Sequence, residues 1–132
     1  MRVNEVDWKG DYYACKVIRQ TRYTGFPSIS VEREAIIAIS RYHHPNVVDI
    51  VDIWTEEEAF ATIFYIQMEL CDGDLHDFLQ RQYKCGTEIP LSESTIWKIF
   101  IQIMTGVEFI HSRGIVHGSL KPKNSNFLCP RC

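Results

Sequence analysis

The chain has 132 residues, of which 45% are hydrophobic and 23% are charged, and its formal net charge is −3. Such a chain can bury the core of one ordinary domain, and its composition excludes an intrinsically disordered protein. The small negative charge provides no general attraction to nucleic acid or to an anionic membrane surface, so we expect neither as a partner.

The five cysteines are an odd number without regular spacing, which does not indicate a disulfide framework. Reduced thiols inside a cell are the simpler interpretation, so we expect a cytoplasmic or nuclear protein. The motif Cys129-Pro130-Arg131-Cys132 has no second pair and offers at most two of the four ligands that zinc prefers, so we interpret it as two incidental thiols. No segment has the pattern of a signal peptide or of a membrane-spanning helix.

The first part of the sequence predicts a hairpin followed by a helix. Segments 2–8 and 11–19 flank a Lys-Gly turn, so we expect two antiparallel strands there. Apolar residues then recur at steps of three and four, which predicts a helix over 28–42. The residues that set this period are Val31, Ala35, Ile36 and Ile39. The His44-Pro45 pair stops the helix, because proline disfavours the helical conformation in the residue before it.

Two strands and two helices are expected next. Segments 47–54 and 60–70 are rich in β-branched and aromatic residues, which is typical of strands. A short amphipathic helix is expected over 74–82, and the longest helix over 92–112, with Ser92 as its N-cap. The longest helix is apolar on nearly all faces, which is typical of a helix that is covered by other elements.

The segment 115–124 carries the most specific chemistry. Its run His117 to Asn124 reads H-G-S-L-K-P-K-N and resembles the catalytic loop H-R-D-L-K-P-x-N of eukaryotic protein kinases, whose Asp accepts the proton of the attacking hydroxyl. Gly118 stands at the Arg position, and Ser119 stands at the Asp position. A serine hydroxyl cannot take that proton at neutral pH, and the loss of a positioned base costs roughly 10²–10⁴ in rate. The motif thus indicates the family and predicts that its chemistry is impaired.

The order of the expected elements is similar to the protein kinase fold from its second strand to its catalytic loop. The resemblance implies an α+β, kinase-like fold that is incomplete. Residues 1–73 would form part of the small lobe and the hinge, as an antiparallel sheet with one helix. Residues 74–132 would form the first helices of the larger lobe and its catalytic loop.

The segment Tyr13 to Ile18 resembles the strand that carries the V-A-I-K lysine of kinases. The resemblance implies that Lys16 holds the α- and β-phosphates of ATP, whereas the residues alone also allow an exposed strand lysine. Glu34 lies near the place where the family puts the partner of this lysine. We favour Glu34 over Glu32, with one extra residue before the His-Pro turn, and the alternative is that both are ordinary surface glutamates.

The run Ile66 to Leu75 resembles the hinge between the two kinase lobes. The resemblance implies that Met68 is the gatekeeper and that the backbone of Glu69 and of Cys71 faces the adenine edge. Asp74 stands where a polar residue often contacts the ribose. It also suits the N-cap of the following helix, and the sequence leaves the two roles open.

Four further positions complete the nucleotide site that the resemblance implies. Val3 and Ala14 would line the adenine, Lys121 would steady the γ-phosphate, and Asn124 would bind magnesium. The expected cofactors are therefore ATP and magnesium.

Two phosphate-handling motifs of the family do not occur in the sequence, since no G-x-G-x-x-G precedes Val3 and no D-F-G follows Asn124. Together with Ser119, this predicts a truncated, inactive (pseudokinase-like) protein-kinase homologue with a residual ATP pocket. Its bare helix over 92–112 would bind a protein partner, either another kinase or its substrate. Two alternatives stay open: a binding module that needs no nucleotide and acts as a kinase decoy, and an incomplete piece of a Ser/Thr kinase that retains ATP binding and phosphotransfer.

Overall fold

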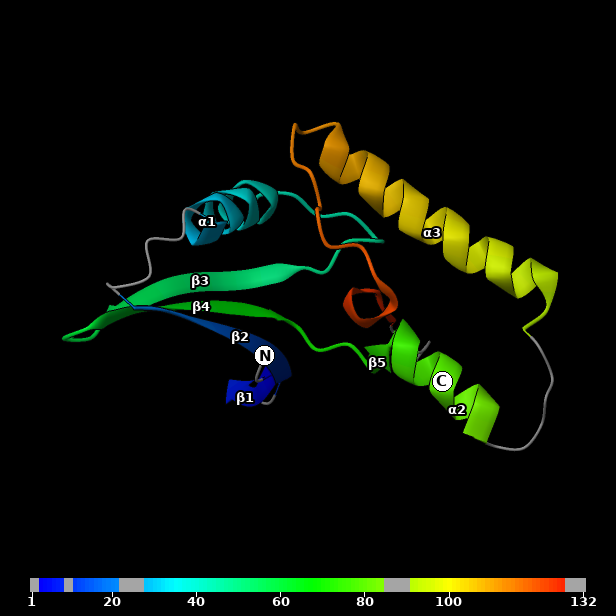
Figure 1. Ribbon diagram of the computed structural model, residues 1–132, viewed down its shortest axis with the longest axis horizontal. Helices are drawn as coiled ribbons and strands as arrows, with labels where there is room; N and C mark the ends of the chain where they lie inside the picture. Colours follow the sequence, from blue (N-terminus) through cyan, green and yellow to red (C-terminus); the bar gives the residue numbers. More distant parts are fainter. Residues whose placement is uncertain (1–2, 9–10, 22–27, 85–90, 128–132) are drawn as a thin grey trace. The chain divides into compact units, whose positions relative to one another are not determined.

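A computed structural model of the chain describes residues 3–8, 11–21, 28–84 and 91–127 (Figure 1). The chain divides into two compact units. Unit 1 comprises Met1–His43 and Val48–Leu70, and unit 2 comprises His44–Val47 and Cys71–Cys132. The short segment His44–Val47 therefore belongs with the second half of the chain, although it lies within the first half of the sequence.

Unit 1 is an antiparallel sheet with one helix against one of its faces (Figure 1). The strand order is β1-β2-β4-β3. The elements are β1 (Val3–Trp8), β2 (Asp11–Thr21), α1 (Ser28–Ile39), β3 (Ile50–Glu57) and β4 (Ala61–Glu69). The predicted α+β class with an antiparallel sheet is confirmed.

The core of unit 1 lies between the sheet and α1. Phe64 and Ile66 of β4 are only 3% and 2% exposed. Lys16 lies directly opposite Ile66 in the β2–β4 register, and cross-strand partners point to the same face of a sheet. The guanidinium of Arg33 on α1 lies 5.6 Å from the centroid of the Phe64 ring, which identifies this face as the one that α1 covers. Lys16 is therefore directed toward α1.

The segment between α1 and β3 differs from the prediction. The helix expected to reach residue 42 ends at Ile39, and the hydroxyl of Ser40 donates to the carbonyl of Ile37 at 2.9 Å. The strand expected from residue 47 begins at Ile50, because His44–Val47 forms a bridged turn that is closed by a bond from the Val47 N–H to the His44 carbonyl at 3.0 Å. A hydroxyl that bonds the preceding turn and a proline in the next turn both work against continued helix.

Unit 2 consists of helices and one short strand pair. Its elements are β5 (Gly73–Asp74), α2 (Leu75–Lys84), α3 (Glu93–His111), the 3₁₀ helix η1 (Pro122–Asn124) and β6 (Asn126–Phe127), with β5 paired to β6. The strand pair was not predicted. It brings the ring of Phe127 within 5.7 Å of the Phe78 ring in an edge-to-face contact, and so ties the end of the described chain to α2.

Helix α3 is anchored by its own cap and by the segment His44–Val47. The hydroxyl of Ser92 accepts a bond from the Thr95 N–H at 3.2 Å, as predicted for an N-cap. Near the other end, a Cβ built at Gly106 would lie 2.5 Å from the carbonyl oxygen of Asn46. The His44 ring stacks on the Phe109 ring with centroids 4.4 Å apart. A glycine is therefore required at residue 106 for this close approach.

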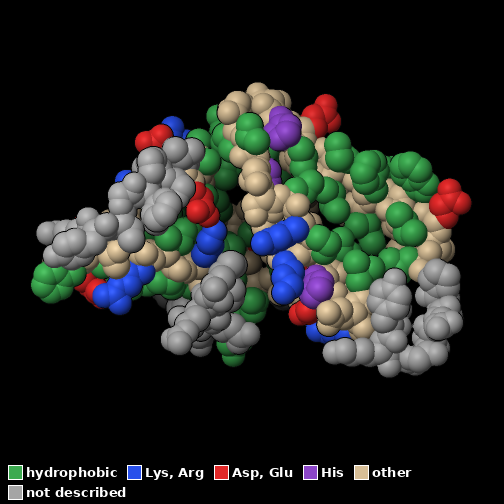
Figure 2. Space-filling view, viewed as in Figure 1, with side chains coloured by type: hydrophobic (Ala, Val, Ile, Leu, Met, Phe, Trp, Pro, Cys, Tyr) green, Lys and Arg blue, Asp and Glu red, His purple; other side chains and the backbone are tan. Residues whose placement is uncertain are grey.

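Much of α3 is exposed and apolar. Figure 2 shows hydrophobic side chains gathered along this helix. Five of them on the exposed side are between 45% and 59% exposed: Ile96, Trp97, Phe100, Ile101 and Met104. Among the helices of the described chain, none combines the length and the apolar character needed to cross a membrane.

Candidate functional site

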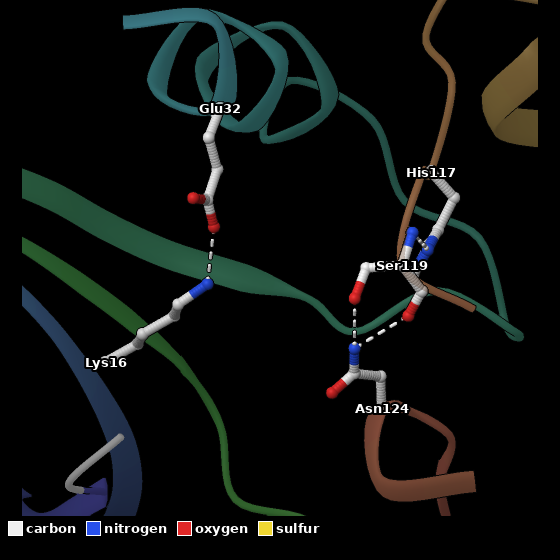
Figure 3. Close-up of polar contacts among 5 residues, drawn as sticks. All are labelled: Lys16, Glu32, His117, Ser119 and Asn124. Carbon is white, nitrogen blue, oxygen red and sulfur yellow. Dashed lines mark hydrogen bonds and ion pairs between the residues drawn. The ribbon is translucent and has the colours of Figure 1, made fainter. Parts of the chain in front are cut away.

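Lys16 on β2 forms an ion pair with Glu32 on α1 (Figure 3). Its Nζ donates to Oε1 of Glu32 at 2.6 Å, with the two side chains 27% and 46% exposed. The prediction that Glu34 is the partner is wrong. Two residues along a helix turn the side chain through about 200°, so the side chain of Glu34 is directed away from Lys16 when that of Glu32 faces it.

The residues that precede Lys16 on β2 belong to the core of unit 1. Ala14 and Cys15 are both buried, and Ala14 lies opposite Met68 in the β2–β4 register. Burial raises the pKa of the Cys15 thiol, and a backbone hydrogen bond with Ile66 offsets part of that shift. Val3 lies opposite Lys16 in the β1–β2 register. Thus the strand positions expected to line a nucleotide do lie together in one sheet.

The end of β4 is tied to the segment before β3. The Glu69 carboxylate accepts a bond from the Asp49 N–H at 2.9 Å, and the Glu69 N–H donates to the Asp49 carbonyl at 3.0 Å. The carboxylate of Asp49 in turn contacts Nδ1 of His43 at 2.7 Å. This His43–Asp49–Glu69 chain was missed from the sequence, because six residues separate His43 from Asp49 and no local period joins them.

Asp74 acts as the N-cap of α2. Its Oδ1 accepts a bond from the Asp77 N–H at 2.8 Å, as an N-cap does, and its contact with the ribose stays a prediction. Cys71, also predicted at the hinge, is partly buried.

The loop that resembles a kinase catalytic loop is organised around Ser119 (Figure 3). Nδ2 of Asn124 donates to the Ser119 carbonyl at 2.7 Å and to the Ser119 hydroxyl at 2.9 Å. The Ser119 N–H donates to Nδ1 of His117 at 3.3 Å. Gly118 has a φ of +66°, a conformation that side chains rarely adopt, so the glycine at the family's Arg position fits the turn.

Lys121 is the N-cap residue that precedes η1, and its side chain is exposed. Its carbonyl accepts bonds from the Asn124 N–H at 2.8 Å and from the Ser125 hydroxyl at 3.2 Å. These bonds fix the backbone between Lys121 and Asn124. Among the described residues, no group of three or more His, Cys, Asp or Glu side chains is arranged to hold a metal ion.

These elements are those of a protein kinase: a strand lysine paired with a helix glutamate, and a loop of the sequence H-x-x-L-K-P-x-N. The family model described as "Protein kinase domain" matches residues 3–129. The chain belongs to the protein kinase family, as the sequence predicted.

Similar proteins are protein kinases of several kinds. The chain is 39% identical over 82 residues to the mitosis inhibitor protein kinase wee1 of Schizosaccharomyces pombe, covering 61% of this chain and 9% of that protein. It is 30% identical over 110 residues to the serine/threonine-protein kinase pkn3 of Myxococcus xanthus, covering 83% and 18%. It is 32% identical over 114 residues to the serine/threonine-protein kinase ksp1 of Schizosaccharomyces pombe, covering 85% and 22%. The chain thus spans less than a quarter of the length of these relatives.

Proposed function

We propose that this chain binds ATP with magnesium and does not transfer the phosphate at an appreciable rate. The observation that carries the proposal is the formed Lys16–Glu32 pair in a family member whose loop has Ser119 at the position of the base. Active kinases require this lysine–glutamate pair for nucleotide positioning, and they require the aspartate for the chemistry. This chain has the lysine–glutamate pair and has a serine in place of the aspartate.

The donor set in each unit suits its expected ligand. In unit 1, Lys16 is held by Glu32 with 27% of its side chain exposed, so its ammonium can still reach a phosphate oxygen. In unit 2, Asn124 directs its Nδ2 at Ser119, which leaves the amide oxygen as the atom that would bind magnesium. Lys121 is exposed and would contact phosphate as a point charge.

Ser119 supports the absence of phosphate transfer. Its hydroxyl is already a partner of Asn124, and a serine hydroxyl is not basic at neutral pH. Positioning of the nucleotide alone leaves the acceptor hydroxyl without a group to take its proton. We therefore expect turnover lower than that of an intact kinase by roughly 10²–10⁴.

Isothermal titration of ATP and magnesium into the full chain tests the binding. We expect saturable heat with the wild type and a loss of affinity of about tenfold or more in Lys16→Met, because a phosphate contact is removed. Lys98→Met is the matched control, since Lys98 is an exposed lysine on α3. The absence of heat with the folded wild type, or equal affinities for both variants, would overturn the proposal.

One observation favours a second candidate function, a binding module that acts without nucleotide. The exposed apolar residues of α3 form the kind of surface that binds a protein partner. Under this alternative, a purified kinase domain would bind the chain equally with and without ATP, and Ile101→Asp would weaken that binding. Lys16→Met would leave the binding unchanged.

A further inference from the structure

One face of the unit 1 sheet is covered by no helix of that unit. Helix α1 lies against the face that carries Phe64 and Ile66, and it is the only helix described in unit 1 (Figure 1). Successive side chains of a strand point to opposite faces, so Tyr65 lies on the other face. Trp54 stands directly opposite Tyr65 in the β3–β4 register and shares its face. We call this the outer face of the sheet.

An aromatic stack lies on the outer face. The rings of Trp54 and Tyr65 have their centroids 5.0 Å apart, and their planes differ by only 5°. Because β3 is the outer strand of the sheet, Tyr65 covers one side of the indole, and no strand in the described part of the chain lies beyond the other side. Trp54 is 36% exposed. The stack therefore holds an indole ring in a fixed orientation with one side open to solvent.

Two carboxylates flank this indole. Asp52 and Glu56 lie two residues before and two residues after Trp54 on β3, so their side chains share the outer face, and both residues are exposed. Oδ1 of Asp52 accepts the Ile53 N–H at 2.7 Å, and Oε2 of Glu56 accepts the Tyr65 hydroxyl at 3.1 Å. One oxygen of each carboxylate is thus used, and the other oxygen can accept a hydrogen bond from a ligand.

The flanking carboxylates have no cationic partner among the residues that the structure describes. Arg19 of β2 lies on the same face, since it stands two residues from Val17, the cross-strand partner of Tyr65. Its guanidinium is already paired with the Glu58 carboxylate at 2.7 Å. The surface around the indole is therefore negative, and a negative surface beside an open aromatic ring favours a cationic ligand.

We propose that the outer face binds an arginine side chain that is carried by a segment of a partner protein. The guanidinium stacks on the open side of Trp54 and donates to Glu56, whose other oxygen is held by the Tyr65 hydroxyl. Asp52 adds negative charge on the other flank of the ring. Because the Lys16–Glu32 pair lies on the face that α1 covers, the proposal does not depend on nucleotide binding.

The geometry favours arginine over lysine. A guanidinium is planar and carries its N–H groups in its own plane, so it can stack on an indole and still donate sideways to a carboxylate. The ammonium of lysine is a compact point charge, and the approach that brings it over the ring directs it away from the carboxylate. Equal charge on two ligands should therefore not give equal affinity.

An NMR titration of the full chain tests this preference. The probes are two peptides of equal charge, Gly-Arg-Gly-Arg-Gly and Gly-Lys-Gly-Lys-Gly, and the signals followed are the Trp54 indole N–H and the Thr55 amide. We expect saturable shifts with the arginine peptide, binding at least about twofold weaker with the lysine peptide, and weakening of both by added salt. Shifts that do not saturate, or equal affinities of the two peptides, would overturn the proposal.

Two tryptophan substitutions locate the binding. Trp54→Leu removes the aromatic ring and keeps an apolar side chain, so we expect the arginine peptide to bind roughly twofold to fivefold more weakly. Trp97→Leu is the matched control, because Trp97 is an exposed tryptophan of α3 whose indole N–H is bonded to Glu93. It should leave the affinity unchanged, and equal losses in the two variants would contradict the proposed site.

Two glutamate substitutions serve if Trp54→Leu does not fold. Glu56→Gln removes the charge and keeps an acceptor for the Tyr65 hydroxyl, and we expect a loss of affinity of about twofold or more. Glu57→Gln is the control with the same change of charge, because Glu57 lies on the opposite face of β3 and bonds the Thr62 hydroxyl. Equal losses would mean that the peptide senses only the overall charge, and this would overturn the proposal.

A second copy of the chain is the remaining occupant of the outer face. Sedimentation of the chain alone distinguishes it, since the proposal predicts that the outer face does not mediate self-association. A dimer that the arginine peptide dissociates, and that Trp54→Leu weakens, would mean that a second copy occupies this face and would overturn the proposed partner.

Discussion

The Nζ of Lys16 lies 2.6 Å from Oε1 of Glu32, and the exposed Glu34 lies two residues further along α1. The pair joins a strand to the only helix described in unit 1, so it orients the lysine from outside its own strand. Because the lysine retains some exposure, the pair is expected to matter more for nucleotide affinity than for folding.

Glu32→Gln is expected to lower the affinity for ATP by roughly threefold to tenfold, because the lysine loses its orienting charge. The same substitution should change the free energy of unfolding in urea by less than about 1 kcal/mol, as is usual for a partly exposed ion pair. Glu34→Gln is the matched control and should leave the affinity within about twofold of the wild type. A larger loss in Glu34→Gln than in Glu32→Gln would contradict the assigned pair.

Gly106→Ala is expected to destabilise the chain, although glycine to alanine within a helix normally stabilises by about 1 kcal/mol. The added Cβ would lie 2.5 Å from the Asn46 carbonyl oxygen, a backbone atom that cannot move aside as a side chain can. We expect a net loss of roughly 1–3 kcal/mol, as is typical of overpacking. Urea unfolding shows whether the free energy of unfolding falls or rises in the variant. A variant more stable than the wild type would disprove this packing.

Asp74→Ala is expected to destabilise the chain by about 1 kcal/mol through loss of the N-cap of α2. Asp74→Asn should retain the stability of the wild type, since asparagine caps as well as aspartate. If both variants lose ATP affinity, the carboxylate also contacts the nucleotide. Equal urea midpoints for Asp74→Ala and the wild type would contradict the cap.

The Cys15 thiol is expected to react slowly with iodoacetamide, because burial raises its pKa and lowers the thiolate fraction at any given pH. Its folded-state pKa is above its unfolded value, so the stability that it contributes is complete below the unfolded pKa and is lost as the pH rises toward the folded one. Mass spectrometry of peptides after timed labelling should therefore show Cys71 modified before Cys15 at pH 8. The reverse order would show that Cys15 is accessible in solution.

The sequence predicted those features that depend on local signals. The helix period, the β-branched strands and the Ser92 cap are set by neighbouring residues, and the His117 to Asn124 motif names its own family. The choice between Glu32 and Glu34 depended instead on the rotation of α1 relative to the sheet, which tertiary packing decides. Counting residues back from the His-Pro pair could not identify the correct glutamate. The reason is that α1 ends at Ile39, and the chain then passes through an irregular turn.

Two further features were beyond sequence reasoning because they join distant segments. The two-residue strands β5 and β6 are too short to carry a period, and their pairing spans more than fifty residues. The close approach of Gly106 to Asn46 gives no signal in either segment alone. Glycine within a helical pattern indicates only that something approaches it closely.

A phosphotransfer assay on the full chain tests the central claim, which is ATP binding without transfer. The assay follows the γ-phosphate from ATP and magnesium to a mixture of serine, threonine and tyrosine peptides, at nucleotide concentrations that saturate the calorimetric titration. We predict no transfer above that of Ser119→Ala, because neither side chain can take the proton of the acceptor. Transfer by the wild type that clearly exceeds that of Ser119→Ala would contradict the account and would assign Ser119 a part in the chemistry.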